Sequence, residues 1–145
     1  MRAHVRRLAQ DKSAVAAVEF ALAAPLALTL LLGVLQIGLA MQAHNAMRGA
    51  AGEIGRYVVV EYMTENELDD GQIEDAAIAR ATAAPYLLKG NNLDVEATTD
   101  AGNTVEGTKK IDLTIDYEVP GILPFAPFNV ISMTVEKSIY AYNPD

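Results

Sequence analysis

The sequence contains no cysteine and no tryptophan, and it contains only two histidines. Without cysteine, disulfides and thiolate metal sites are excluded, although this absence does not identify a compartment. His4 lies in a basic flank and His44 lies on the polar side of a predicted helix, so neither has a nucleophile as a neighbour. The carboxylates are scattered over predicted loops and strand faces. We therefore predict no catalytic site, metal site, cofactor or small-molecule substrate, and we predict that the chain is not an enzyme.

Charge is also absent from Phe20 to Ala40. A helix of about 21 residues rises roughly 31 Å, about the thickness of the hydrocarbon core of a bilayer. The run is much longer than the apolar core of a cleaved secretory signal, so it predicts an uncleaved signal-anchor helix. Glu19 stands at its N-terminal edge. A carboxylate there costs free energy unless it lies near the interface or has a partner, which makes Glu19 a candidate functional residue.

The two sides of this run carry opposite charge. Before it come four basic residues and one acid, namely Arg2, Arg6, Arg7 and Lys12 with Asp11. After Ala40 there are 17 acidic against 7 basic side chains, a balance of −10. Basic flanks remain in the cytoplasm, so we expect the N-terminus inside and the acidic domain outside. An acidic domain without a basic patch also argues against a nucleic-acid partner.

The length of 145 residues leaves room for one small domain beyond the anchor. We expect a basic leader or cytoplasmic flank over residues 1–14, a transmembrane helix over 15–40 and an extracytoplasmic domain over 41–145. The predicted fold class is α+β, with a long N-terminal helix, a short second helix and a small antiparallel three-stranded meander.

The first helix is predicted to run from about residue 14 to about residue 62, half of it apolar on all sides and half amphipathic. In its second half the apolar positions follow helical spacing: Ala43, Ala46, Met47, Ala50, Ala51, Ile54 and Val58. Pro25 is expected to bend the helix or loosen one turn. Gly33 and Gly38 leave shallow places where another helix could approach. The glycines at 49, 52 and 55 weaken the helix and allow close packing against it.

Seven acids fall between Glu61 and Asp75, without the spacing of a calcium loop. We interpret them as a solvated loop that opens a second helix. That helix is expected from about residue 72 to residue 88, capped by Asp70 and ended by Lys89 and Gly90. Its thin apolar face comprises Ile73, Ala76, Ala77 and Ala84.

From residue 91 onward the apolar period is two, which predicts strands. The strands are expected near residues 93–98, 111–119 and 129–142, with a turn at 100–103. The phase of the last strand slips at Lys137, which predicts a bulge. Between the last two strands, Pro120, Pro124 and Pro127 predict a loop that contains Phe125 and Phe128.

The line Ala14-Val-Ala-Ala-Val-Glu19-Phe20-Ala-Leu-Ala-Ala-Pro25, after a short Arg-rich leader, resembles the N-terminal signature of TadE-like proteins. These are pseudopilins and minor pilins of the tight-adherence (Flp/Tad, type IVc) pilus. The resemblance is strongest over residues 6–50 and weaker over the β-rich remainder, where only the order of elements matches. It implies a non-enzymatic component of pilus assembly and secretion that contributes to surface adhesion. It also implies residence in a bacterial inner membrane with a periplasmic domain, either kept there or incorporated into an extracellular pilus.

The same resemblance implies processing by a prepilin peptidase, five residues before the acid, between Ala14 and Val15. Ala14 stands where these leaders usually have glycine. The cut would remove four basic residues and Asp11 and move the formal charge from −8 to −11. In pilin-like assemblies the acid pairs with the N-terminal amine of a neighbouring subunit. The resemblance thus makes Glu19, Phe20 and Pro25 the expected subunit contacts, with pilus subunits and assembly-platform proteins as partners.

Two alternatives stay open from the sequence. Glu19 could be a boundary residue at the headgroup level with no role in assembly. The whole chain could be a periplasmic binding or scaffold module of a secretion machine, tethered by an uncleaved anchor. Within a pilus system, entry into the fibre, capping of the fibre and priming of assembly are all compatible with this sequence.

Overall fold

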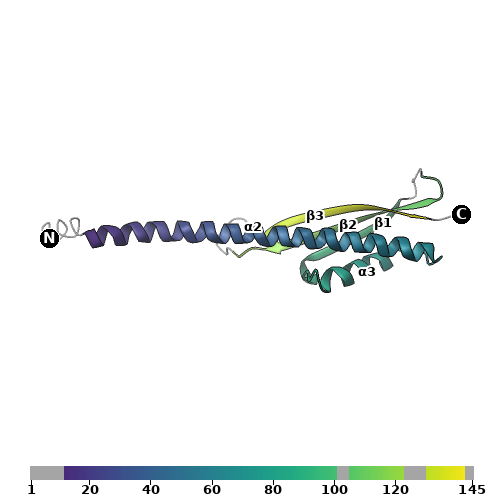
Figure 1. The fold of residues 1–145 in the computed structure, drawn as a ribbon, viewed down its shortest axis with the longest axis horizontal. Coiled ribbons are helices and arrows are strands. Elements are labelled where there is room, and N and C mark those ends of the chain that lie inside the picture. Colours follow the sequence, from purple (N-terminus) through teal and green to yellow (C-terminus); the bar gives the residue numbers. More distant parts are fainter. Residues whose placement is uncertain (1–11, 101–104, 123–129, 143–145) are drawn as a thin grey trace. The chain divides into compact units, whose positions relative to one another are not determined.

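A computed structural model of the chain describes residues 12–100, 105–122 and 130–142. In chain order its elements are α2 (Lys12–Met63), α3 (Asp70–Thr82), the single 3₁₀ turn η1 (Gly90–Asn92), β1 (Leu93–Asp100), β2 (Thr108–Pro120) and β3 (Val130–Tyr142) (Figure 1). The predicted α+β fold is confirmed. Contacts divide the chain into two compact units, residues 1–37 and residues 38–145. The leader up to residue 11, most of the predicted turn at 100–103, and Pro124, Phe125, Pro127 and Phe128 lie outside the described residues.

Helix α2 confirms the predicted long helix to within two residues at each end. It continues through Pro25, which has no N–H to donate to the carbonyl of Ala21. From Ala43 onward one face of the helix is buried, and its members recur at helical spacing. They are Ala43, Met47, Ala50, Ala51, Ile54, Val58 and Tyr62.

The sheet is an antiparallel meander in the order β1-β2-β3, as predicted. On β2 every second residue from Ile111 to Val119 is buried, so one face of the sheet forms the core and the other faces solvent. β2 and β3 pair without interruption from Thr108↔Tyr142 to Pro120↔Val130. The predicted bulge at Lys137 is therefore wrong.

Lys137 lies on the same face of β3 as the buried Ile139. Its side chain passes over Gly55 of α2, where a Cβ would come within 2.8 Å of Lys137 Cε. The aliphatic stem of lysine can cover apolar surface while the ammonium group reaches water. Lys137 can therefore lie on the inner face of β3 without a bulge in the strand.

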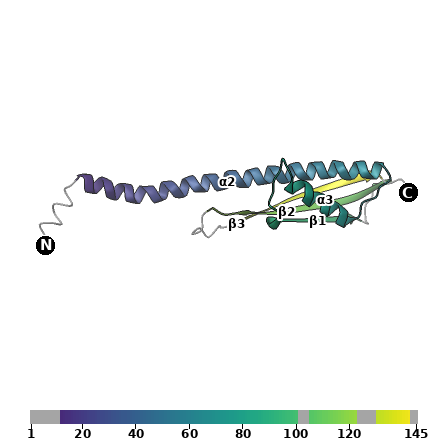
Figure 2. The ribbon, with the colours of Figure 1, turned by 90° about the horizontal axis from the view of Figure 1, so that it is seen from below.

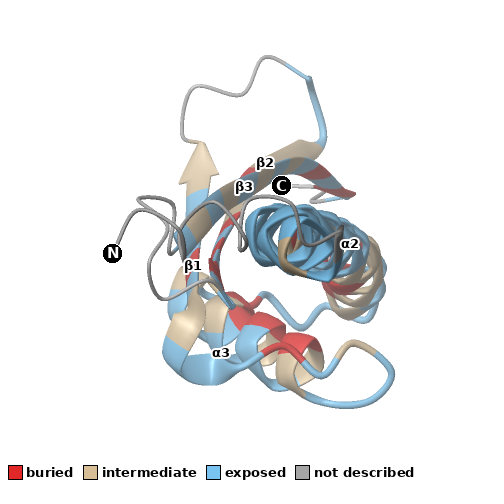
Figure 3. Cartoon of the chain, turned by 90° about the vertical axis from the view of Figure 1, so that its left-hand side faces the viewer, coloured by how far each residue is buried: buried red, intermediate tan, exposed pale blue. Residues whose placement is uncertain are grey.

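One face of the sheet is covered by the second half of α2 and by α3, and the opposite face is open (Figure 2). Buried residues of α3 and of the strands face the interior (Figure 3). The core joins α2, α3 and all three strands, and its largest fully buried side chains are Met47, Ile54, Ile73, Ile111, Leu113, Ile115 and Val58. Apolar burial of this kind is the main favourable term for a domain of this size.

Helix α3 differs from its prediction at both ends. Its N-cap is Asp69, not Asp70: Asp69 Oδ1 accepts from Gln72 N at 2.8 Å, and Gln72 Oε1 accepts from Asp69 N at 3.0 Å, a capping box. The helix ends at Thr82, because the residues before Pro85 are biased away from the helical region. Ala84 is therefore outside the helix and exposed, and the buried face consists of Ile73, Ala77 and Ala81.

Two acids of α3 close the free edge of β1. Glu74 Oε1 accepts from the backbone N–H of Ala97 at 3.0 Å. Asp70 Oδ2 accepts from the backbone N–H of Thr99 at 3.3 Å, and its other oxygen accepts from the Thr99 hydroxyl at 2.5 Å. The predicted solvated acidic segment thus supplies structural hydrogen bonds to an edge strand.

The loop between α2 and α3, which belongs to the acidic segment, also has contacts with the rest of the domain. Tyr62 donates its hydroxyl to the carbonyl of Leu68 at 3.1 Å, and burial raises the pKa of this phenol. Lys109 forms an ion pair with Glu67 at 3.0 Å. The loop between α2 and α3 is therefore tied to α2 on one side and to the start of β2 on the other.

The open face of the sheet carries carboxylates bonded to hydroxyls and one lysine. Lys110 Nζ lies 2.7 Å from Asp112 and 3.4 Å from Asp100, and the Ser138 hydroxyl donates to Asp112 at 2.6 Å. The hydrogen bond from Lys110, followed by that from Ser138, lowers the pKa of Asp112. The same bond to Asp112 raises the pKa of Lys110. These groups face solvent, and their hydrogen bonds and ion pairs link β1, β2 and β3 on the outer face of the sheet.

The glycines of α2 allow close packing at two of the three predicted positions. At Gly49 a Cβ would lie 2.5 Å from Cε1 of the Tyr86 ring. At Gly55 it would meet the Lys137 side chain, whereas at Gly52 it would meet nothing within 4 Å. Gly49 is thus the place where the loop after α3 rests directly on the helix.

Candidate functional site

The predicted assembly residues lie on the first unit, where the apolar surface of α2 is exposed. Phe20 is 73% exposed, and its large apolar neighbours are exposed as well: Val15, Val18, Leu22, Leu26, Leu28, Leu30, Leu31, Val34, Leu35 and Ile37. α2 contains a stretch long and apolar enough to cross a membrane, and only 6% of that stretch is buried. A helix with apolar side chains on all sides requires an apolar environment, either lipid or other helices.

Glu19 is exposed within this apolar surface. No hydrogen bond or ion pair of its carboxylate is present among residues 12–100, 105–122 and 130–142. Val15 and Glu19 are four residues apart, so they lie on one face, one turn or about 6 Å along the axis. Phe20 lies about 100° further around the helix and belongs to a different face. The helix therefore brings the predicted amine position and the acid together, but it separates both from Phe20.

The predicted processing site lies in the first turn of α2. Ala14 is half-buried and Val15 is exposed. The first four N–H groups of a helix have no intrahelical acceptor, so this turn opens more easily than the interior. Pro25 lies about three turns further on, where its carbonyl accepts from the Thr29 hydroxyl at 2.8 Å. The Thr29 hydroxyl is thus a side-chain donor to the Pro25 carbonyl, next to the place where the backbone bond to the Ala21 carbonyl is missing.

An exposed apolar helix that continues under a small α+β domain defines a pilin-like protein. A family model described as TadE-like protein matches residues 14–56, and the resemblance seen in the sequence is thereby confirmed for this segment. The matched segment ends inside α2, so it includes Glu19 and all five glycines of α2 but no part of the sheet. No curated protein and no solved structure matches the chain.

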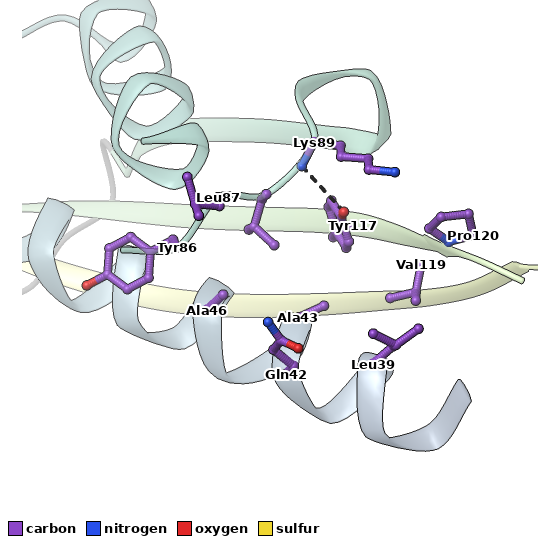
Figure 4. Close-up of a pocket in the computed structure, with 11 residues that line it drawn as sticks. Leu39, Gln42, Ala43, Ala46, Tyr86, Leu87, Lys89, Tyr117, Val119 and Pro120 are labelled. Carbon is purple, nitrogen blue, oxygen red and sulfur yellow. Dashed lines mark hydrogen bonds between the residues drawn. The ribbon is translucent and has the colours of Figure 1, made fainter. Parts of the chain in front are cut away.

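A second site, which the sequence did not predict, lies in the domain itself. A groove of about 270 Å³ is bounded by the start of the packed part of α2, by the loop after α3 and by the end of β2. Its lining residues include Leu39, Gln42, Tyr86, Lys89, Val119 and Pro120 (Figure 4). The lining is mainly apolar, and no acid belongs to it.

The loop that forms one wall of the groove is held rigidly. The backbone N–H groups of Tyr86 and Leu87 both donate to the carbonyl of Ala83 at 3.0 Å, and that of Leu88 donates to Ala81 at 3.0 Å. The Lys89 N–H donates to the hydroxyl of the buried Tyr117 at 3.4 Å. Burial, and then the carboxylate of Glu53, raise the pKa of Tyr86. Pro85 could have indicated this loop in the sequence. Its packing partner on α2, Gly49, is distant in sequence, so the groove could not be predicted from a local pattern.

Other polar groups have structural partners. Arg80 of α3 stacks over the Tyr57 ring at 4.0 Å from its centroid and lies 3.8 Å from Glu53, so it joins α3 to α2. Among the described residues no group of three or more histidines and acids could hold a metal ion. The described residues therefore provide two contact surfaces. One is the apolar surface of the first half of α2, which carries Glu19, and the other is the apolar groove in the domain.

Proposed function

We propose that this protein is a non-enzymatic minor pilin or pseudopilin of a tight-adherence (type IVc) pilus. A single helix holds it in the bacterial inner membrane with the N-terminus in the cytoplasm and the α+β domain in the periplasm. From there it acts in pilus biogenesis and surface adhesion together with other pilus subunits and assembly-platform proteins. The observation that carries this proposal is the exposed apolar surface of α2 with Glu19 as its acid, within the segment that matches the TadE-like family.

In this proposal Glu19 sets the position at which the helix enters a bundle. Once a prepilin peptidase has cut between Ala14 and Val15, the new amine lies one turn from Glu19 on the same face. A neighbouring helix displaced along the axis by one turn then places its amine beside this carboxylate. In an apolar bundle an unpaired carboxylate is costly, whereas the pair is attractive. Only displacements that form the pair are therefore favourable.

The experiment compares Glu19→Ala with Glu19→Asp and with Glu136→Gln. Glu136 lies on the exposed outer face of β3, so its replacement removes a carboxylate without touching α2. We expect Glu19→Ala to remain in the membrane fraction after alkaline carbonate extraction but to lose piliation and adhesion. Glu19→Asp should retain part of both, and Glu136→Gln should behave as the parent. Normal piliation and adhesion in Glu19→Ala would make the boundary-residue interpretation correct and refute the assembly role.

Processing is tested by N-terminal mass spectrometry of the membrane-extracted protein. We expect a chain that begins at Val15 in cells with the prepilin peptidase and at Met1 in cells without it. Ala14→Gly should be cut at least as efficiently, because glycine is the usual residue at this position of such leaders. Ala14→Leu should remain intact. An intact Met1 start in peptidase-positive cells would favour the tethered periplasmic module instead.

A further inference from the structure

Seventeen acids follow Ala40, yet three segments of the domain contain none of them. These are residues 38–47, 83–92 and 119–122, and they meet around the groove of Figure 4. We call this surface the acid-free pole. It carries one exposed cation, Lys89, and exposed apolar side chains on all three segments: Leu39, Met41, Leu87 and Ile122. Acids lie at its margin: Asp94, Asp116 and Glu118 line a hollow with Asn91 and Asn92, and the Glu53 carboxylate contacts Tyr86.

Leu87 has the most unusual position at this pole. Its side chain is 69% exposed, and its backbone φ is 53°, in the left-handed region that disfavours residues with a Cβ. Its neighbours on both sides are anchored, since the Tyr86 ring packs on Gly49 and Leu88 is buried. The turn therefore presents a large apolar side chain to the outside on a rigid support. The backbone hydrogen bonds of Leu87 to Ala83 and of Leu88 to Ala81 hold this conformation in place.

We propose that the acid-free pole rests in the headgroup layer of the membrane that holds α2, with Leu87 inserted among the acyl chains and Lys89 beside lipid phosphates. This proposal depends on the membrane anchoring proposed above. Three observations favour lipid as the partner. The uncharged run from Phe20 to Ala40 leads directly into the pole, acids that phosphates would repel are missing from it, and its exposed groups combine leucine, isoleucine and lysine. Apolar side chains accompanied by lysine are typical of surfaces that lie at a membrane interface.

The absence of cysteine makes a direct test simple, because single cysteines can be placed in the full chain. Leu87→Cys is labelled with an environment-sensitive fluorophore and reconstituted in phosphatidylethanolamine/phosphatidylglycerol vesicles, with and without lipids that carry a shallow nitroxide. The matched control is Glu65→Cys in the loop after α2. Glu65 is also exposed and also has a left-handed backbone, with φ 62°. Both variants therefore place cysteine under similar backbone strain.

We expect a blue-shifted emission at position 87 that the nitroxide lipid quenches, and an emission at position 65 that it does not quench. Equal behaviour at the two positions would refute the proposal. Protection of position 87 from aqueous iodide without quenching by the lipid would also refute it, since a second copy of the chain would then cover the pole. Adding Leu87→Glu to a chain labelled at Asn91→Cys should reduce the quenching there, and no change would count against lipid insertion by Leu87.

Carbonate extraction of the same vesicles separates this proposal from the proposed function. A chain that is extracted has no membrane anchor, and both proposals then fail. A chain that is retained but unquenched at position 87 keeps its anchor and loses only the contact at the pole. Tyrosine fluorescence of each variant verifies folding, because all six tyrosines lie between residues 57 and 142.

Discussion

Gly49, Gly52 and Gly55 of α2 allow one stability prediction in which a single chemical change meets three different surroundings. Replacing glycine by alanine inside a helix gains about 1 kcal/mol from backbone propensity. At Gly52 nothing lies within 4 Å of the new methyl group, so Gly52→Ala should gain this full amount. At Gly49 the methyl group would come within 2.5 Å of the Tyr86 ring. Overpacking costs typically 1–3 kcal/mol, so Gly49→Ala should end between neutral and about 2 kcal/mol destabilising.

Gly55→Ala should fall between the other two. Its new methyl group would meet Lys137 Cε at 2.8 Å and Ile139 Cγ1 at 3.5 Å. The second distance is ordinary contact, and the first involves the far end of a flexible side chain. Lys137 can move toward solvent at the cost of the apolar surface that its stem covers. We therefore expect a small net change, within about 0.5 kcal/mol of the parent.

The assay is urea unfolding of the full chain in detergent, followed by tyrosine fluorescence. All six tyrosines lie in the second unit and no tryptophan masks them, so the signal reports this unit alone. A change in midpoint at constant slope is a change in stability. The expected order of midpoints is Gly52→Ala, then Gly55→Ala, then Gly49→Ala. Equal gains at Gly49 and Gly52 would show that the Tyr86 loop does not rest on the helix, and they would refute the described packing of the groove.

Two further predictions concern the carboxylates of the domain. Glu74→Gln removes a charged acceptor from the N–H of Ala97, and Asp70→Asn does the same for Thr99; each should cost about 1 kcal/mol and speed amide exchange at that residue. Asp75→Asn, on the exposed side of α3, is the control, and unchanged exchange at Ala97 in Glu74→Gln would contradict the closed edge. The second prediction concerns stability in acid. The pKa of Asp112 is lowered in the folded state. The ionised Asp112 therefore adds to the free energy of unfolding above its unfolded pKa near 3.8, and this addition is lost as the pH falls through the folded pKa. Asp112→Asn should therefore flatten the loss of stability in acid, Ser138→Ala should do so to a smaller extent, and an unchanged acid profile for Asp112→Asn would remove the assigned role of Lys110.

Most of the fold could be predicted because its signals are periodic. The alternation from Ile111 to Val119 and the helical spacing from Ala43 to Val58 each repeat often enough to identify a face. Lys137 misled the prediction because polarity was taken as a sign of the outer face, whereas a long lysine stem can lie on the inner one. The end of α3 was predictable from Pro85, and its cap was predictable from the Asp69 and Gln72 pair.

The functional surfaces were predictable only where they are local in sequence. Glu19 stands out because its neighbours are all apolar. The acid-free pole does not, since it forms from three segments that come together only in the fold. Likewise, nothing in the sequence indicates that Glu74 reaches the backbone of Ala97, because α3 and β1 become neighbours through the turn at residues 83–92.

The closed edge of β1 has a consequence for how sheets of this protein can associate. The N–H groups of Ala97 and Thr99 point away from β2, which fixes the alternation of hydrogen bonds across the antiparallel sheet. By the register of β2 with β3, every second residue of β3 from Ser132 to Tyr140 then points its backbone N–H and C=O groups away from β2, at the opposite edge of the sheet. Among the described residues no side chain bonds to that edge. With one edge sealed and one unpaired, two copies that meet edge to edge form a single continuous sheet whose outer margins are both β1 strands. A further strand on the β1 edge of that sheet would have to displace Glu74 and Asp70 from the N–H groups of Ala97 and Thr99, which disfavours growth beyond two copies.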